Sequence, residues 1–206
     1  MSPERARTAA HPARPAGLLV LVVVSAALIG YRILDRTTMS LTPRPSGDVR
    51  SHHPAVPGEA DGVVPDGVTA FDNQYPAVAR LNPALRSALR RATTDAAGDG
   101  VQIVVNSGWR SPKYQEQLLL EAITTYGSRQ AAARWVASPS ASAHVQGRAV
   151  DLGPARAAAW LSRHGARYGL CQIYRDEAWH YERRPAAVRD GCPPLYADPT
   201  HDPRLK

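Results

Sequence analysis

Residues 140–153 have the sequence SASAHVQGRAVDLG, which places one acidic residue, Asp151, inside the apolar run from Ala149 to Leu152. An unpaired carboxylate among buried aliphatic side chains is costly, so such groups are normally paired or bound to a metal ion. A histidine, His144, precedes Asp151 in the same segment. We therefore expect the fold to bring a partner for Asp151 from another part of the chain.

The composition limits what kind of protein this is. The chain has 206 residues, 44% of them hydrophobic, which suffices for one domain with a core and for appended segments. Its formal net charge is +7, but the 25 basic residues are spread along the chain without a dense basic block. We therefore expect no binding to nucleic acid, and the positive charge suits an anionic surface such as a cell wall or lipid headgroups. We also expect a monomer.

The N-terminal region predicts export from the cytoplasm. A short basic N-terminus covers residues 1–14, and a strongly apolar segment covers residues 15–34. We predict a membrane anchor, because the apolar run continues through Leu28 and Ile29 and approaches the length of a spanning helix. The alternative is a secretory signal that is cleaved near Ser25. In either case we expect the remaining chain to function outside the cytoplasm, attached to the cell membrane or secreted.

The rest of the chain divides into a linker and a domain. Residues 35–66 are rich in proline and lack apolar periodicity, so we predict a flexible linker. Residues 67–206 form the predicted domain and contain both cysteines of the chain, Cys171 and Cys192. A single cysteine pair in an exported chain predicts one disulfide bond, and the alternative is two independent buried thiols.

The domain is predicted to combine helices with short strands. Asn82-Pro83 and Ser111-Pro112 each join a capping side chain to a proline at the first helical position, and so predict two helix starts. The predicted helices cover residues 83–97, 113–127, 128–137 and 154–164, and the predicted strands cover residues 101–106, 147–153, 169–174 and 178–184. Because helices and strands do not alternate regularly, we predict an α+β fold.

A partner for Asp151 appears in the segment YRDEAWHYE, residues 174–182, which contains Glu177 and His180. Together with His144, these residues supply two imidazoles and one carboxylate, a set that suits a catalytic zinc ion with one position left for water. Zinc lowers the pKa of bound water to about 7, and a nearby carboxylate such as Glu177 must then transfer protons. Taken singly, each residue also has an ordinary structural explanation, such as a loop histidine or a surface carboxylate.

The full pattern is more specific than these residues alone. Two motifs resemble those of the VanY-type D-alanyl-D-alanine carboxypeptidases, which belong to the LAS group of zinc metallopeptidases: Ser142-x-His144-x-x-Gly147-x-Ala149-x-Asp151 and Glu177-x-Trp179-His180. The segment SGWRSPKYQ, residues 107–115, is similar to the upstream motif of this group, with Trp109 where a tyrosine is usual. The resemblance covers roughly residues 68–192.

The resemblance implies a fold and a cofactor. The implied fold is hedgehog/DD-peptidase-like, with a small, mainly antiparallel sheet flanked by helices. The implied cofactor is Zn²⁺, with His144, Asp151 and His180 as its ligands. The implied partners are peptidoglycan stem peptides.

The resemblance also implies roles for four further residues. Glu177 would act as general base and general acid. Arg110 would polarise the scissile carbonyl and stabilise the oxyanion, as fixed donors in a dry site do. Gln115 and Ser142 would help to hold the peptide. The implied activity is that of a zinc-dependent D-alanyl-D-alanine carboxypeptidase that trims peptidoglycan stem peptides.

Two alternatives stay open at this point. One is an endopeptidase or dipeptidase of the same group, because Tyr168 and Glu177 are separated by a shorter segment than in many relatives, which leaves the bond preference open. The other is a non-catalytic, zinc-stabilised module that binds cell-wall peptides. Glu177 and Arg110 favour an enzyme, since binding alone requires no proton transfer.

Overall fold

The computed structural model describes residues 56–205, so the predictions for residues 1–55, including the membrane anchor, lie outside the described part. No helix formed by residues 56–205 combines the length and the apolar character that crossing a membrane requires.

The end of the predicted linker contacts the domain. It contains the short 3-10 helix η1 (Glu59–Asp61). Oδ1 of Asp61 accepts a hydrogen bond of 2.8 Å from the hydroxyl of Ser111, the residue that caps a later helix. Part of the predicted linker therefore contacts the predicted domain.

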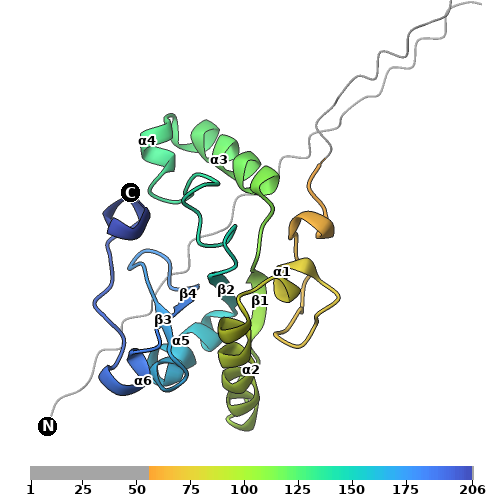
Figure 1. Cartoon of the computed structure of the whole chain (residues 1–206), viewed down its shortest axis with the longest axis vertical. Helices are drawn as coiled ribbons and strands as arrows, with labels where there is room; N and C mark the ends of the chain where they lie inside the picture. The colour runs from red at the N-terminus through yellow and green to blue at the C-terminus, as the bar shows by residue number, and fades with distance from the viewer. Residues whose placement is uncertain (1–55, 206) are drawn as a thin grey trace, which may run out of the picture. The chain divides into compact units, whose positions relative to one another are not determined.

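An antiparallel sheet lies at the centre of the described residues (Figure 1). Its strands, in the spatial order β1-β2-β4-β3, are β1 (Val104–Ser107), β2 (Ala149–Gly153), β4 (His180–Arg183) and β3 (Leu170–Gln172). Each neighbouring pair is antiparallel. The strands that carry Asp151 and His180 are therefore adjacent and central.

Helices surround this sheet. They are α1 (Pro76–Ala79), α2 (Pro83–Gly98), α3 (Pro112–Tyr126), α4 (Arg129–Ala132), α5 (Ala155–His164) and α6 (Ala187–Asp190), with the further 3-10 helices η2 (Gly165–Tyr168), η3 (Pro199–His201) and η4 (Pro203–Leu205). This combination of helices with a small antiparallel sheet confirms the predicted α+β class.

Capping side chains set the starts of the two longest helices. The side chain of Asn82 accepts a hydrogen bond from the backbone N–H of Ala84 at 3.0 Å, and the hydroxyl of Ser111 accepts one from Tyr114 at 3.0 Å. Each bond satisfies a backbone donor that has no partner within its helix. Helices α2 and α3 therefore begin where the cap-and-proline pattern predicts.

Helix α4 is shorter than predicted. The sequence suggested a helix over residues 128–137, but α4 ends at Ala132. The chain turns so that the carbonyl oxygen of Ala137 accepts a hydrogen bond of 2.9 Å from Gln115. This long-range bond was not visible in the local sequence pattern.

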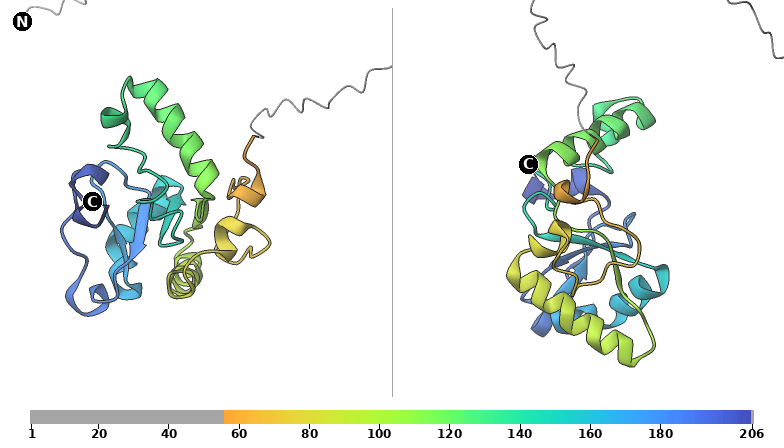
Figure 2. Two further views of the ribbon diagram at one scale, coloured as in Figure 1. Left: turned by 45° about the horizontal axis from the view of Figure 1, so that its top comes forward. Right: turned by 90° about the vertical axis from the view of Figure 1, so that its right-hand side faces the viewer.

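One face of the sheet packs against α2 and α5 (Figures 1 and 2). The core on this face includes Leu85, Leu89, Trp160, Leu161, Val105, Val150, Leu152 and Tyr181. Successive side chains of a strand point to opposite faces. Asp151 lies between the core residues Val150 and Leu152, and His180 precedes Tyr181, so both functional side chains face away from this core.

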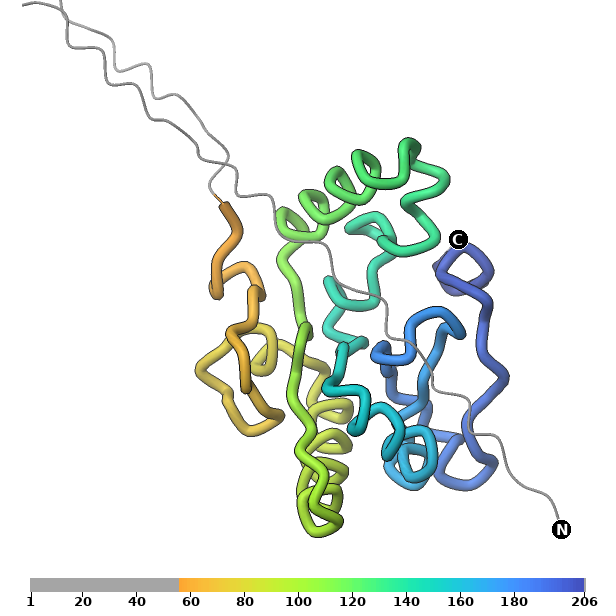
Figure 3. The backbone as a smooth tube through the Cα atoms, turned by 180° about the vertical axis from the view of Figure 1, so that it is seen from behind, coloured from red at the N-terminus to blue at the C-terminus, as the bar shows by residue number. Residues whose placement is uncertain are grey.

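Residues 192–205, which we call the C-terminal segment, follow α6 and extend towards the region of α4 (Figures 1 and 3). Cys192 is bonded to Cys171 of β3, which confirms the predicted disulfide. Further along, Tyr196 forms a parallel bridge with Tyr174. The C-terminal segment is thus held against the sheet.

Candidate metal centre

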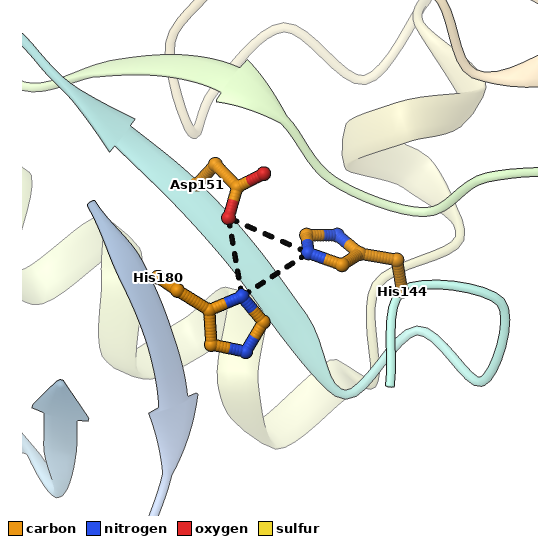
Figure 4. Close-up of side chains that lie close together, drawn as sticks. All are labelled: His144, Asp151 and His180. Carbon is orange, nitrogen blue, oxygen red and sulfur yellow. Dashed lines mark hydrogen bonds and ion pairs between the residues drawn. The ribbon is translucent and has the colours of Figure 1, made fainter. Parts of the chain in front are cut away.

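The sheet register brings two of the predicted ligands together. Asp151 and His180 are directly paired positions of β2 and β4. His144 comes from the loop before β2, and its imidazole points towards the other two side chains (Figure 4). All three side chains are buried, and they form a group that could hold a metal ion.

The distances within this group fit a small cation. Nδ1 of His180 lies 3.2 Å from Oδ1 of Asp151, Nε2 of His144 lies 3.4 Å from the same oxygen, and the two nitrogens are 3.3 Å apart. Tetrahedral zinc with ligand distances of 2.0–2.2 Å places its ligand atoms about 3.3–3.6 Å apart. Two imidazoles and one carboxylate at this spacing therefore match a zinc site with a free position.

The loop that carries His144 depends on a glycine. Gly147 has φ +65°, and a Cβ atom there would lie 2.5 Å from the backbone oxygen of Arg80. The tight turn places the ring of His144 so that Nδ1 lies 2.8 Å from the carbonyl oxygen of Gly108. Since a carbonyl only accepts, Nδ1 carries the proton and Nε2 presents its lone pair to Asp151 and His180.

Burial and charge set the protonation of the group. Burial alone would raise the pKa of Asp151, but His144, His180 and Arg110 hold it well below its ordinary value, so the carboxylate is ionised. Burial lowers the pKa of His144. Burial also opposes the charge on His180, but hydrogen bonds to Asp151 and Glu182 raise its pKa to about 9. A bound cation therefore has to displace a proton from His180.

Glu177 lies beside this group with one oxygen engaged and one free. Its Oε2 is 3.7 Å from Nδ1 of His180. Among the residues that the structure describes, its buried Oε1 has no hydrogen-bond partner. Burial raises the pKa of Glu177 to about 7. A carboxylate with such a pKa can both accept and donate a proton near neutral pH.

Arg110 is fixed by three hydrogen bonds. Its Nε donates to Ser107 at 2.8 Å, Nη1 to Gln115 at 3.2 Å, and Nη2 to Asp151 at 2.9 Å. Gln115 is itself buried, and its Nε2 donates to Ala137. The amide of Gln115 is therefore occupied at both ends and orients Arg110.

A cavity of about 240 Å³ opens over these residues. Ser142 lines it, as the predicted peptide contact would require. Trp135, which the sequence analysis did not predict, lines the same cavity and remains 38% exposed. Its ring stacks on that of Tyr126 with centroids 5.9 Å apart. The turn after α4 thus adds an aromatic wall to the site.

Glu182 is a second residue that was not predicted. Its Oε1 lies 3.5 Å from Nε2 of His180, and its Oε2 receives ion pairs from Arg204 at 2.7 Å and from Arg184 at 3.0 Å. Burial alone would raise its pKa, but hydrogen bonds from His180 and Arg204 lower it to about 2. The period of two along β4 could have indicated Glu182, whereas no local pattern indicates Arg204.

Parts of this chain are similar in sequence to known proteins. The family model described as VanY, D-alanyl-D-alanine carboxypeptidase, matches residues 78–185, more than half of the 206 residues. A curated D-alanyl-D-alanine carboxypeptidase from Enterococcus faecalis is 30% identical over an alignment of 111 residues, with coverage of 42% of this chain and 41% of the relative. The chain thus spans about two fifths of the length of that relative.

Two solved structures are similar to part of this chain. One is a mutant of the vancomycin-resistance D,D-pentapeptidase VanY in complex with Zn(II), with 26% identity, a TM-score of 0.47 and coverage of 50% of this chain and 72% of the other. The second is VanYB in complex with D-Alanine-D-Alanine, with 27% identity, a TM-score of 0.47 and coverage of 50% and 71%.

Proposed function

Since the chain belongs to the VanY family of D-alanyl-D-alanine carboxypeptidases, we propose that it is a zinc-dependent carboxypeptidase that removes the terminal D-alanine from peptidoglycan stem peptides. The observation that carries this proposal is a single cavity that is lined by the group of potential metal ligands and also by Glu177 and Arg110. A binding module would need neither of the last two.

Three residues would hold the zinc ion: His144, Asp151 and His180. Their donor atoms include no thiolate, and this mixed nitrogen and oxygen set with three protein ligands is typical of catalytic zinc sites. When bound, zinc acts as a Lewis acid that polarises a carbonyl group and acidifies water.

Glu177 would move the protons of the reaction. Its free Oε1 can accept a proton from the attacking water, and the pKa of about 7 lets the same group donate a proton to the leaving amine. Glu177 is 7% exposed, so bulk water does not compete strongly for this proton.

Arg110 would stabilise the charge that develops on the carbonyl oxygen. Its guanidinium is held in place before the substrate arrives, so little reorganisation is needed as the charge appears. We assign Gln115 to the orientation of Arg110 and Ser142 to the wall that contacts the peptide.

We also propose that the protein works outside the cytoplasm, at the membrane surface or after secretion. The apolar segment of residues 15–34 supports this proposal, and so does the disulfide between Cys171 and Cys192, since such bonds persist in oxidising compartments. Fractionation of cells that express the full chain tests it, because recovery of the intact chain in the cytoplasm would contradict export.

Defined stem peptides test the proposed activity. The full chain, loaded with zinc, is incubated with a pentapeptide that ends in D-Ala-D-Ala and with the same peptide lacking the last residue, and the products are identified by mass. We expect loss of one alanine from the pentapeptide and no product after chelation.

Two other outcomes would each indicate a different function. Cleavage inside the peptide would indicate an endopeptidase or dipeptidase of the same group. Saturable binding of the peptide to the zinc-loaded chain without any product would indicate a binding module and would contradict the proposed enzyme.

A further inference from the structure

The imidazole of His180 has a fixed partner on each side. Its Nδ1 faces Asp151 and His144, while its Nε2 lies 3.5 Å from Oε1 of Glu182. Nδ1 can bind a cation only when it carries no proton, so the proton of the neutral ring must be on Nε2. Glu182 is then the acceptor that selects this tautomer and holds the ring plane.

Glu182 itself depends on arginine. It is 2% exposed, and a buried carboxylate is costly unless charges and hydrogen bonds compensate it. Nη1 of Arg204 donates to its Oε2 at 2.7 Å, and Arg184 approaches the same oxygen at 3.0 Å. Arg204 thereby keeps Glu182 ionised and directed at His180.

Arg204 is in turn held by a second buried acid. Asp202 is fully buried, its Oδ1 accepts from Nε of Arg204 at 2.8 Å, and its Oδ2 accepts from Nη2. The hydroxyl of Tyr174 also donates to Asp202, at 3.1 Å, and the ring of Tyr174 lies 5.0 Å from that of His180. These contacts connect Arg204 to His180 along two routes.

The C-terminal segment, which carries Arg204, also contacts the turn after α4 and lines the cavity. Asp198 accepts a hydrogen bond of 3.1 Å from Nε of Arg134, which follows α4. Pro199 and Leu205 line the cavity together with Trp135. The C-terminal segment therefore forms part of the cavity lining.

We propose that Arg204 is a positioning residue of the metal centre: by pairing with Glu182 it orients the imidazole of His180 for metal binding. This inference depends on the proposed metal site but not on the proposed substrate. Loss of such outer partners typically lowers metal affinity about 10- to 100-fold. Because Arg184 also pairs with Glu182, we expect the smaller of these losses.

The inference is tested by measuring the zinc affinity of the metal-free full chain. The measurement uses competition with a chromophoric chelator in the absence of peptide. Arg204→Ala should weaken zinc binding about tenfold. Arg204→Lys, which keeps the charge but not the fork of donors, should lie between wild type and Arg204→Ala. The control Arg189→Ala removes an arginine that is 80% exposed and pairs with Asp190 on α6, and should bind zinc like the wild type.

A double-mutant cycle separates positioning from a general loss of structure. If Arg204 acts through Glu182, Arg204→Ala should add little to the loss caused by Glu182→Gln. Additive losses, or an unchanged zinc affinity of Arg204→Ala, would overturn the inference. If Arg204→Ala fails to fold, as judged by thermal unfolding of the metal-free chain, Arg204→Lys and Glu182→Gln carry the same comparison.

Zinc affinity and peptide cleavage distinguish a failure of this inference from a failure of the proposed function. A chain that binds zinc tightly, loses affinity in Arg204→Ala and cleaves no stem peptide would support the positioning role and contradict the carboxypeptidase. A chain that cleaves the peptide but shows equal zinc affinity with and without Arg204 would support the carboxypeptidase and contradict the positioning role.

Discussion

At the scale of single residues, the two carboxylate oxygens of Glu177 have different surroundings. One lies 3.7 Å from Nδ1 of His180, and the other is buried without a hydrogen-bond partner among residues 56–205. A buried polar atom without a partner is costly, so such atoms are rare unless they serve a reaction or a ligand. The free oxygen of Glu177 is consistent with the proton transfer that we propose for this residue.

The substitution Glu177→Gln tests this role. Gln has nearly the same shape but cannot accept the proton, so kcat/KM should fall by about 10²–10⁴-fold. The zinc content should stay at the wild-type value, because Glu177 is not one of the three grouped ligands. The matched control is Asp176→Asn, which removes the charge of the exposed neighbouring acid and should leave kcat/KM nearly unchanged. Substantial activity in Glu177→Gln would exclude the role.

The sequence indicated the potential metal ligands better than the residues that hold these ligands in place. His144, Asp151 and His180 stand in two motifs, and strand periodicity places Asp151 opposite the core. Glu182 lies two positions after His180 and shares its face of β4, so the same period could have indicated it. Arg204 reaches Glu182 from a proline-rich segment, and only tertiary packing makes this contact.

At the scale of elements, the short turn between His144 and β2 determines where the first ligand lies. Gly147 closes this turn at φ +65° against the backbone of Arg80, and its carbonyl oxygen accepts a hydrogen bond from Asn82 at 2.8 Å. The turn is thus attached to the start of α2. Any side chain at this position meets both a steric clash and an unfavourable backbone conformation.

The substitution Gly147→Ala should lower stability and weaken zinc binding. The conformational cost of a positive φ is about 1–2 kcal/mol, and the clash with Arg80 adds to it. Gly127→Ala is the matched control, because Gly127 has φ +80° but no atom within 4 Å of the added carbon. Chemical denaturation of the metal-free variants should show a larger loss for Gly147→Ala, and equal losses would contradict the importance of the close contact.

The turn after α4 is the element that differs most from its prediction. The sequence predicted a helix through residue 137, whereas α4 ends at Ala132 and Trp135 in the following turn lines the cavity. Local helix propensity could not reveal this, since the turn depends on the bond between Gln115 and Ala137.

The substitution Trp135→Ala tests the aromatic wall. A half-exposed tryptophan in contact with a substrate contributes about 1 kcal/mol, so KM should rise about fivefold while kcat and zinc content change little. Phe71→Ala is the control, since Phe71 is 51% exposed and is not among the residues that line the cavity. An equal KM in both variants would remove Trp135 from the substrate site.

At the scale of the whole molecule, the metal centre joins parts that are far apart in the chain. His144 comes from a loop, Asp151 and His180 come from central strands, and the C-terminal segment supports them from outside. The fold class could be predicted from local patterns. The closure of the site by the C-terminal segment could not, because it depends on contacts between distant residues.

Zinc should therefore stabilise the entire domain. A ligand at 100 times its Kd adds about 2.7 kcal/mol, which corresponds to a rise in Tm of about 5–10 °C for a domain of this size. Calorimetry with and without chelator measures this shift. His180→Ala should abolish it, while His164→Ala, at a histidine that contacts Trp160 in a tilted arrangement outside the metal group, should preserve it. A full shift in His180→Ala would exclude His180 as a ligand.

The direct pairing of Asp151 with His180 in the sheet has a consequence for folding accuracy. If β4 slipped by one residue along β2, the imidazole would turn into the apolar layer and Tyr181 would enter the polar side. Such a misaligned sheet would lack one of the proposed metal ligands. A metal ion bound by both Asp151 and His180, as we propose, would therefore stabilise only the correct strand alignment and would favour accurate strand pairing in addition to its role as a cofactor.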